Sequence, residues 1–243
     1  MYVLALDTTT RDGSVALVDE HHVIEERRGD AARSHAERLP GELVALAAAH
    51  GLSVSEIDLF AIASGPGSFT GLRIGIATIQ GLALTSGRRI VAVSALEALA
   101  ESAAIAPATW VAAWMDARRQ EVFTALYRIS DAVAFSPERL IEEEEPVVGR
   151  PAATLTRWMS RIRDENVIFA GDGAVQYADA ISSCASVGWR ILPQVPLLAG
   201  TIGLMAAARA KHGDTIDPAA VHPLYVRRPD AEIVRDNMQR GAR

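Results

Sequence analysis

Two stretches of this chain share one pattern, in which an apolar run ends in a carboxylate and leads through a polar turn to a second apolar run. The first stretch covers residues 2–7 and 14–18, and the second covers residues 110–116 and 122–127. Short apolar runs on either side of a turn predict β-hairpins. Superposing the two carboxylates aligns an Ala-Leu pair in each second run without a gap. The pattern therefore favours an internal duplication.

Helix and strand patterns alternate after each hairpin. In the first half they predict strands at 23–27, 59–63 and 90–93, and helices from Ser34, at 71–85 and at 94–100. In the second half they predict helices at 152–163, 174–183 and 202–212 and a strand at 167–170, while residues 142–145 read as a solvated connection. An antiparallel meander followed by βα units, occurring twice, predicts an α/β fold of two related lobes. This is the actin-like ATPase type of sugar kinases and Hsp70, here divided into residues 1–106 and 107–243.

In such a fold a nucleotide lies between the lobes, so the loops after the first strands contain the candidate binding residues. Asp7, Thr8 and Thr9 offer a carboxylate beside hydroxyls, which can hold phosphate oxygens and a hydrated metal ion. Gly171 and Gly173 follow a predicted strand and open a helix, a common place for nucleotides. For Asp7, Thr8 and Thr9 the favoured interpretation is that these side chains satisfy the backbone of their own turn. For Gly171 and Gly173 simple turn formation explains the pattern equally well.

The most distinctive segment is GPGSFTGLR, residues 65–73. It matches neither the dinucleotide fingerprint nor a Walker loop, because its glycines are spaced differently and no lysine follows. Gly71 and Gly75 lie one helical turn apart and Thr78 continues their face, which predicts close packing of another helix. Residues 43–49 are apolar all round, so that helix is buried either within its own domain or by another chain.

Composition excludes several classes of function. Lys211 is the sole lysine and lies in no phosphate-binding loop, and Cys184 is the sole cysteine, which excludes a disulfide framework. A net charge of −6 argues against a protein that binds nucleic acid by itself. No run reaches the ~18 apolar residues of a membrane helix, and no basic start marks a signal peptide. We therefore expect a cytoplasmic protein without membrane attachment.

Five motifs give the chain a resemblance to one family from end to end. They are LALDTT (4–9), SHAERLP (34–40), GPGSFTGLRIG (65–75), DARRQEVF (116–123) and PLYVR (223–227). Together they resemble the TsaB (YeaZ) family. The block at 65–75 is the most specific of the five.

The resemblance implies a non-catalytic scaffold subunit with the two-lobed fold. Such a subunit binds its paralogue TsaD, which transfers threonylcarbamoyl to the adenosine next to the anticodon in tRNAs that read codons beginning with A. The resemblance places the TsaD contact on the helices near 34–50 and 71–86, and it implies self-pairing through the same helices. It also implies a TsaE-type ATPase as a further partner and tRNA contacted through the complex. ATP or ADP would bind at a shared interface rather than to this chain alone. The implied interface residues are Ser34, His35, Leu39, Leu43, Leu46, Gly71, Arg73, Gly75 and Thr78.

Two other functions fit the fold but not the residues. A free-standing ATPase or sugar kinase needs a second DxG-type loop, whereas Asp116 is followed by Ala117 and Arg118. A metallopeptidase needs two histidines spaced H-x-x-x-H, whereas His35 is followed at that spacing by Leu39. We therefore expect neither a metal site nor catalysis by this chain.

Overall fold

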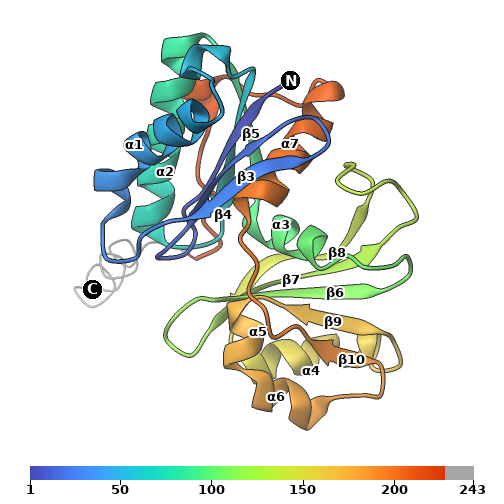
Figure 1. The fold of residues 1–243 in the computed structure, drawn as a ribbon. Coiled ribbons are helices and arrows are strands. Elements are labelled where there is room, and N and C mark those ends of the chain that lie inside the picture. The colour runs from blue at the N-terminus through green and yellow to red at the C-terminus, as the bar shows by residue number, and fades with distance from the viewer. Residues whose placement is uncertain (228–243) are drawn as a thin grey trace, which may run out of the picture.

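The computed structural model describes residues 1–227, and the chain forms two lobes, each built on a five-stranded mixed sheet (Figure 1). The first sheet has the order β3-β2-β1-β4-β5 and contains β1 (Val3–Asp7), β2 (Ser14–Val18), β3 (Val23–Arg28), β4 (Leu59–Gly65) and β5 (Arg89–Ser94). The second has the order β10-β9-β6-β7-β8 and contains β6 (Trp110–Asp116), β7 (Val122–Ile129), β8 (Leu140–Gly149), β9 (Val167–Ala170) and β10 (Trp189–Ile191). In each sheet an antiparallel meander is extended by two parallel strands, which confirms the predicted duplication of architecture.

The register corrects the alignment of the two halves. In the first hairpin Ala5 pairs with Ala16, and in the second the corresponding Trp114 pairs with Thr124. The ungapped alignment placed Ala125 opposite that position, so it is wrong by one residue. The reason is the turn, which is one residue shorter in the second lobe. The matching Ala-Leu pairs are thus a coincidence within a real repeat of topology.

Helices cover both faces of the first sheet. α1 (His35–Ala49) and α2 (Phe69–Ser86) lie on one face, whereas α7 (Ala199–Lys211) lies on the other beside α3 (Ala95–Ser102), as Figure 1 shows. Successive side chains of β1 alternate between these faces, as a pleated strand requires. Leu4 and Leu6 pack with α1 and α2, and Val3 and Ala5 pack with α7. The sheet is therefore buried on both sides.

Local signals explain the two long helices. The carboxylate of Glu37 accepts hydrogen bonds from the Ser34 backbone N–H (2.8 Å) and from the Ser34 hydroxyl (2.7 Å), which fixes Ser34 at the start of α1. α1 then continues through Pro40 without a break. α2 ends at Gly87, whose φ of 65° is a conformation that glycine adopts without strain.

The second lobe is covered by α4 (Pro151–Ile162), α5 (Asp172–Gln176) and α6 (Ala178–Cys184). Elsewhere in the chain, 3₁₀ turns occur at η1 (Val54–Glu56), before β4, and at η2 (Pro218–Ala220), after α7. Two expectations fail in the second lobe. Residues 142–145 are not a connection but lie in the edge strand β8, whose backbone pairs with β7. The single helix predicted at 174–183 is instead two short helices that meet at Tyr177.

The last helix also lies elsewhere than expected. α7 was expected to close the second half, but it packs on β1, β2 and β4 of the first sheet. Gly203 permits this approach, because a Cβ there would lie 2.9 Å from Val18. The N-terminus of α7 is satisfied by the first lobe, since Gly200 N–H donates to Glu26 (2.8 Å) and Ala199 N–H to the Ser14 hydroxyl (3.1 Å). Residues 199–211 therefore belong structurally with the first lobe. Within residues 1–227 no helix combines the length and apolarity needed to cross a membrane.

Candidate functional site

A cleft of about 1410 Å³ lies between the lobes, and both lobes contribute to its walls. Three of the five predicted nucleotide-contacting residues line it, namely Asp7, Thr9 and Gly171. Thr8 is fully buried, and Gly173 is buried behind the wall. The loops after β1 and β9, far apart in the sequence, thus converge as the fold class predicts.

Asp7 ends β1 and holds its own turn together. Its Oδ1 accepts hydrogen bonds from the Thr9 backbone N–H (2.8 Å) and from the Thr9 hydroxyl (2.7 Å). Burial raises the pKa of the Asp7 carboxyl, and the two bonds from Thr9 act against that shift. This geometry agrees with the structural interpretation, in which the Asp and Thr side chains form hydrogen bonds within their own turn.

The glycines of the segment 65–75 pack against this same turn. A Cβ on Gly71 would lie 2.2 Å from the Thr8 carbonyl oxygen, and one on Gly75 would lie 2.3 Å from the Thr8 hydroxyl. A Cβ on Gly67 would lie 2.5 Å from Cβ of Thr9. The prediction that Gly71 and Gly75 face a partner is therefore wrong. Their missing side chains make room for Thr8 of the same chain.

The opposite wall of the cleft is built around the partly buried carboxylate of Asp172. Asp172 Oδ1 accepts from the backbone N–H of Asp116 (2.9 Å) and of Gly173 (2.8 Å), and burial raises the pKa of this carboxyl. A Cβ on Gly171 would lie 2.1 Å from the Trp114 carbonyl oxygen, and one on Gly173 would lie 2.9 Å from the Met115 carbonyl carbon. Both glycines are packed against β6, so they do not form an open cradle for phosphate.

The loop after β6 shows an unusual backbone that sequence reasoning missed. Arg118, Arg119 and Gln120 have φ values of 59°, 55° and 61°. Side-chain-bearing residues rarely adopt this left-handed region, and strain of this kind clusters at functional sites. Asp116 supports the loop by accepting from Arg118 N–H (2.9 Å). The sequence predicts a polar turn at this place, but no glycine or asparagine marks its left-handed conformation, so there was no local signal for this backbone.

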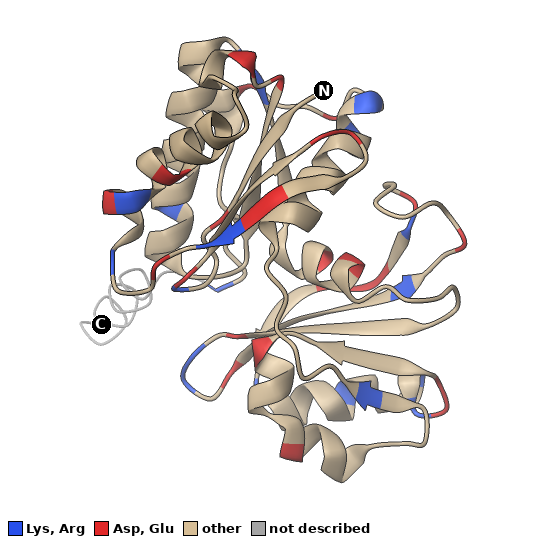
Figure 2. Ribbon diagram, viewed as in Figure 1, with Lys and Arg blue, Asp and Glu red and all other residues tan. Residues whose placement is uncertain are grey.

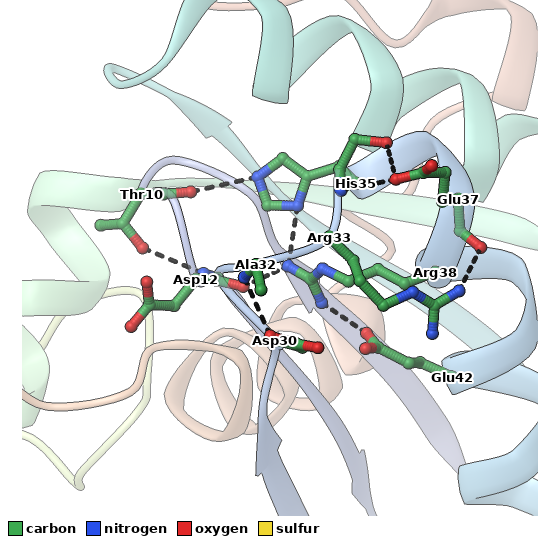
Figure 3. Close-up of polar contacts among 11 residues, drawn as sticks. Thr10, Asp12, Asp30, Ala32, Arg33, His35, Glu37, Arg38 and Glu42 are labelled. Carbon is green, nitrogen blue, oxygen red and sulfur yellow. Dashed lines mark hydrogen bonds and ion pairs between the residues drawn. The ribbon is translucent and has the colours of Figure 1, made fainter.

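A polar network ties helix α1 to the loop between β1 and β2 (Figure 3). His35 Nε2 lies 3.1 Å from the Thr10 carbonyl oxygen, and its Nδ1 lies 2.8 Å from Nη2 of Arg38. Arg38 also donates to the Asp12 carbonyl oxygen and to the Glu42 carboxylate. The Arg38 side chain is completely buried. Burial and the charge of Arg38 lower the pKa of His35, so its neutral form is favoured.

His35 was predicted at a partner interface, but the structure places it at the cleft wall. Arg38 was not predicted at all. Its signal was present, because residues 35, 38 and 42 fall on one helical face. Without knowledge of the fold, charged residues on a helix are expected in solvent.

The cleft is basic although the protein is acidic. Among residues 1–227, seven arginines and four aspartates line it, whereas the whole chain has a net charge of −6. Figure 2 shows basic residues in blue on the loop after β6 and at the end of β3. Several of these arginines are engaged, for example Arg28 with Asp12 (3.3 Å). The excess positive charge still favours an anionic ligand.

The outer faces of α1 and α2 form a second candidate surface. Three predicted interface residues, Leu39, Leu43 and Leu46, are 0% exposed in the core, so they cannot contact a partner. The other predicted residues lie nearer the surface: Ser34 and Arg73 are exposed, and Thr78 is half-buried with its hydroxyl bonded to the Ile74 carbonyl (2.8 Å).

Small and apolar residues occupy the exposed faces of both helices. We call this surface the α1/α2 face, and it comprises Gly41, Val44, Ala45, Ala48, Ala77, Gly81 and Leu84. Val44 is 46% exposed and Leu84 is 60% exposed. A Cβ on Gly41 or Gly81 would meet no atom within 4 Å, so nothing in residues 1–227 requires a glycine at either position. The apolar helix at 43–49 therefore has one face in the core and one in solvent.

Comparisons with known proteins agree on one group. The family model TsaD, described as tRNA N6-adenosine threonylcarbamoyltransferase, matches residues 28–233. The tRNA threonylcarbamoyladenosine biosynthesis protein TsaB of Haemophilus influenzae is 27% identical, over 93% of this chain and 93% of that protein. The Escherichia coli TsaB is 33% identical, over 66% of this chain and 73% of that protein.

Solved structures show the same likeness. YeaZ from Pseudomonas aeruginosa superposes with a TM-score of 0.74 and 28% identity, covering 92% of this chain and 99% of that chain. Together with the two sheets of identical strand order, this confirms the α/β fold of two related actin-like lobes.

Proposed function

Because this chain belongs to the TsaB (YeaZ) family, we propose that it takes part in tRNA threonylcarbamoyladenosine biosynthesis as a non-catalytic, cytoplasmic subunit. In this role it binds a TsaD-type transferase. The observation that carries the proposal is the α1/α2 face. An interior helical glycine costs about 1 kcal/mol relative to alanine, and neither Gly41 nor Gly81 serves packing against any other residue of the described part of the chain. A partner helix that approaches closely gives both glycines a role.

The second lobe supports this interpretation by contrast. α4 occupies the same place after its meander that α1 occupies after β3. Its exposed side includes Thr156, Arg157, Ser160 and Arg161, which suit water rather than a protein partner. An exposed apolar patch in only one of two equivalent helices points to an interaction surface.

The partner that fits this face is a TsaD-type paralogue, with a TsaE-type ATPase joining the pair and tRNA bound by the complex. A second copy of this chain uses the same face when the partner is absent. The subunit positions the transferase for its reaction on the adenosine next to the anticodon, in tRNAs that read codons beginning with A.

A lack of catalysis by the chain itself is supported by two features of the residues. Leu39 stands where a second histidine would complete H-x-x-x-H, and its side chain is in the core. The space beside the cleft glycines is occupied by other atoms of the same chain, so these glycines do not form a preformed phosphate-binding loop for ATP or ADP. We propose that adenine nucleotides bind only at a site shared with the partner. Tight binding of labelled ADP by this chain alone would contradict that statement.

The pathway is tested by depleting the protein and measuring threonylcarbamoyladenosine in bulk tRNA by mass spectrometry of nucleosides. We expect the modification to fall to near zero while the transferase is still present. An unchanged level would overturn the proposed function.

Docking is tested with Ala45→Arg, which places a charge on the α1/α2 face. Since residue 45 is exposed, the variant should fold normally but fail to co-elute with the transferase in size-exclusion chromatography. Ala153→Arg is the matched control, because residue 153 is an exposed alanine on the equivalent helix α4. Equal behaviour of the two variants would place the interface elsewhere.

A further inference from the structure

An aromatic cluster at the cleft has no role in the docking surface described above. Phe69, at the start of α2, stacks on Tyr225 with ring centroids 5.1 Å apart and planes inclined by 29°. The guanidinium of Arg73 lies 4.1 Å from the Phe69 ring centroid, and its Nε donates to the Tyr225 hydroxyl at 2.9 Å. All three residues line the cleft. We call these three residues the platform.

The platform is exposed to solvent although its side chains are held in place by contacts with one another. Phe69 is 37% exposed and Tyr225 is 38% exposed, which is unusual for rings that contact one another across more than 150 residues of sequence. The core does not need them, because neither ring belongs to a buried cluster. An exposed pair of aromatic rings held beside a guanidinium offers π-faces and a positive charge in one place.

The segment that contributes Tyr225 spans both lobes. Leu224 N–H donates to the Ser64 carbonyl of the first lobe (2.7 Å), and Arg227 donates to the Ala117 carbonyl of the second (2.7 Å). Arg227 also lies over the Phe123 ring at 5.6 Å. The platform is thus fixed to both walls of the cleft, within the basic surface described above.

Aromatic rings beside arginines are the means by which proteins hold unpaired nucleotides. Bases stack on aromatic side chains and on guanidinium planes, while neighbouring positive charge meets the phosphates. Every base has a π-face, so such a site selects unpaired nucleotides rather than one sequence. A fully paired duplex does not offer a base to the platform.

We propose that Phe69, Arg73 and Tyr225 bind an unpaired base of the tRNA, so that this subunit contacts the substrate directly. The inference rests on the proposed function, in which tRNA is the substrate of the complex. A free nucleotide has the same stacking chemistry and is distinguished below by competition.

The test uses the full chain in complex with its transferase and measures binding of two labelled RNAs at one fixed salt concentration. One is a hairpin with an unpaired loop, and the other is a duplex of equal length. We expect Phe69→Ala to weaken hairpin binding at least about fivefold and to leave duplex binding unchanged. Phe69→Trp should bind the hairpin within about twofold of the wild-type chain, since it retains a stacking ring.

Tyr2→Ala is the matched control, because Tyr2 is an equally exposed aromatic residue (38%) outside the cleft. It should bind both RNAs as the wild-type chain does. An equal loss for hairpin and duplex in Phe69→Ala would overturn the proposal and indicate a general charge effect. Loss of the transferase from the complex would overturn it in favour of a protein interface. Displacement of the hairpin by AMP at concentrations near the hairpin Kd would assign the platform to a free nucleotide.

Failure of this inference is separable from failure of the proposed function. Normal hairpin binding by Phe69→Ala, with normal modification of tRNA, removes the platform from RNA binding and leaves the docking role intact. The level of threonylcarbamoyladenosine in tRNA after depletion of the protein is measured independently of any RNA-binding variant.

Discussion

The two lobes have the same strand order, but the loops that follow their first strands are built differently. In the first lobe Thr8 is 0% exposed and is enclosed by the glycines of α2. In the second lobe the Arg118 side chain is 82% exposed, and the loop adopts left-handed backbone without a glycine. One loop is thus built into the core, and the other projects from it.

The helices that follow the two meanders differ in the same sense. α1 connects to the cleft through the buried Arg38, and its outer side is apolar. α4 connects to its own sheet through the exposed pair Arg157–Glu144 (2.6 Å), and its outer side is polar. Two lobes of the same topology thus present different surfaces. The burial of a few polar and small residues makes the difference, and it is this difference that the proposed docking role rests on.

The largest effect should come from removing the buried charge of α1. Arg38→Met leaves the His35 ring, the Asp12 carbonyl and the Glu42 carboxylate without a donor. We expect a loss of about 3 kcal/mol in the free energy of unfolding, measured by urea denaturation. Arg157→Met is the matched variant of α4, and because the Arg157 side chain is 43% exposed it should cost less than about 1 kcal/mol. Similar losses in both variants would remove the distinction between the lobes.

A second pair of variants compares the two sides of α2. Gly71→Ala adds a Cβ 2.2 Å from the Thr8 carbonyl oxygen, so the loop or the helix must move. We expect it to lower stability by about 2 kcal/mol, even though alanine favours helix. Gly81→Ala adds a Cβ in open space and should raise the stability of the isolated chain by about 0.5–1 kcal/mol. Thermal melting of both variants checks the signs, and a stabilised Gly71→Ala would refute the packing account.

The third pair compares the backbone of the two loops. Gly13 has a φ of 62°, and a Cβ there would lie 2.4 Å from the Asp7 carbonyl oxygen. Gly13→Ala should therefore cost about 1–2 kcal/mol. Gln120→Gly places glycine where a side-chain-bearing residue has a φ of 61°, and it should stabilise by about 0.5 kcal/mol after the entropy of the unfolded chain is deducted. Denaturation midpoints of both variants give the answer, and destabilisation by Gln120→Gly would show that the loop is unstrained.

Much of the fold could be predicted because its signals are local or repeated. The apolar runs before Asp7 and Asp116 and the stop at Gly87 each depend on a few neighbouring residues. The edge strand β8 was missed because its exposed glutamates hide the alternation of a half-buried strand. The position of α7 was missed because it depends on a contact between Gly203 and Val18, which no local pattern encodes.

The candidate site was predictable to a similar degree. The convergence of Asp7, Thr9 and Gly171 follows from the fold class, so the sequence was enough to expect it. The burial of Leu39 follows from helical periodicity, but the family resemblance directed attention to the wrong side of α1. The stack of Phe69 on Tyr225 joins distant segments and had no signal in the sequence.

The smallest expected effect concerns pH and the network that distinguishes α1 from α4. The folded-state pKa of His35 is lowered by burial and by Arg38, so folding favours the neutral ring. The stability that this provides is present above the unfolded pKa of about 6.5 and is lost as the pH falls through the folded value. Urea denaturation at pH 7.5 and 5.5 should therefore show a larger loss for the wild-type chain than for His35→Gln. Asp7 has a raised pKa and contributes with the opposite sign. It is present in both proteins, so only the part of its shift that comes from the charge of His35 enters the difference. An equal loss in both proteins would mean that His35 does not couple the protonation of the cleft wall to the stability of α1.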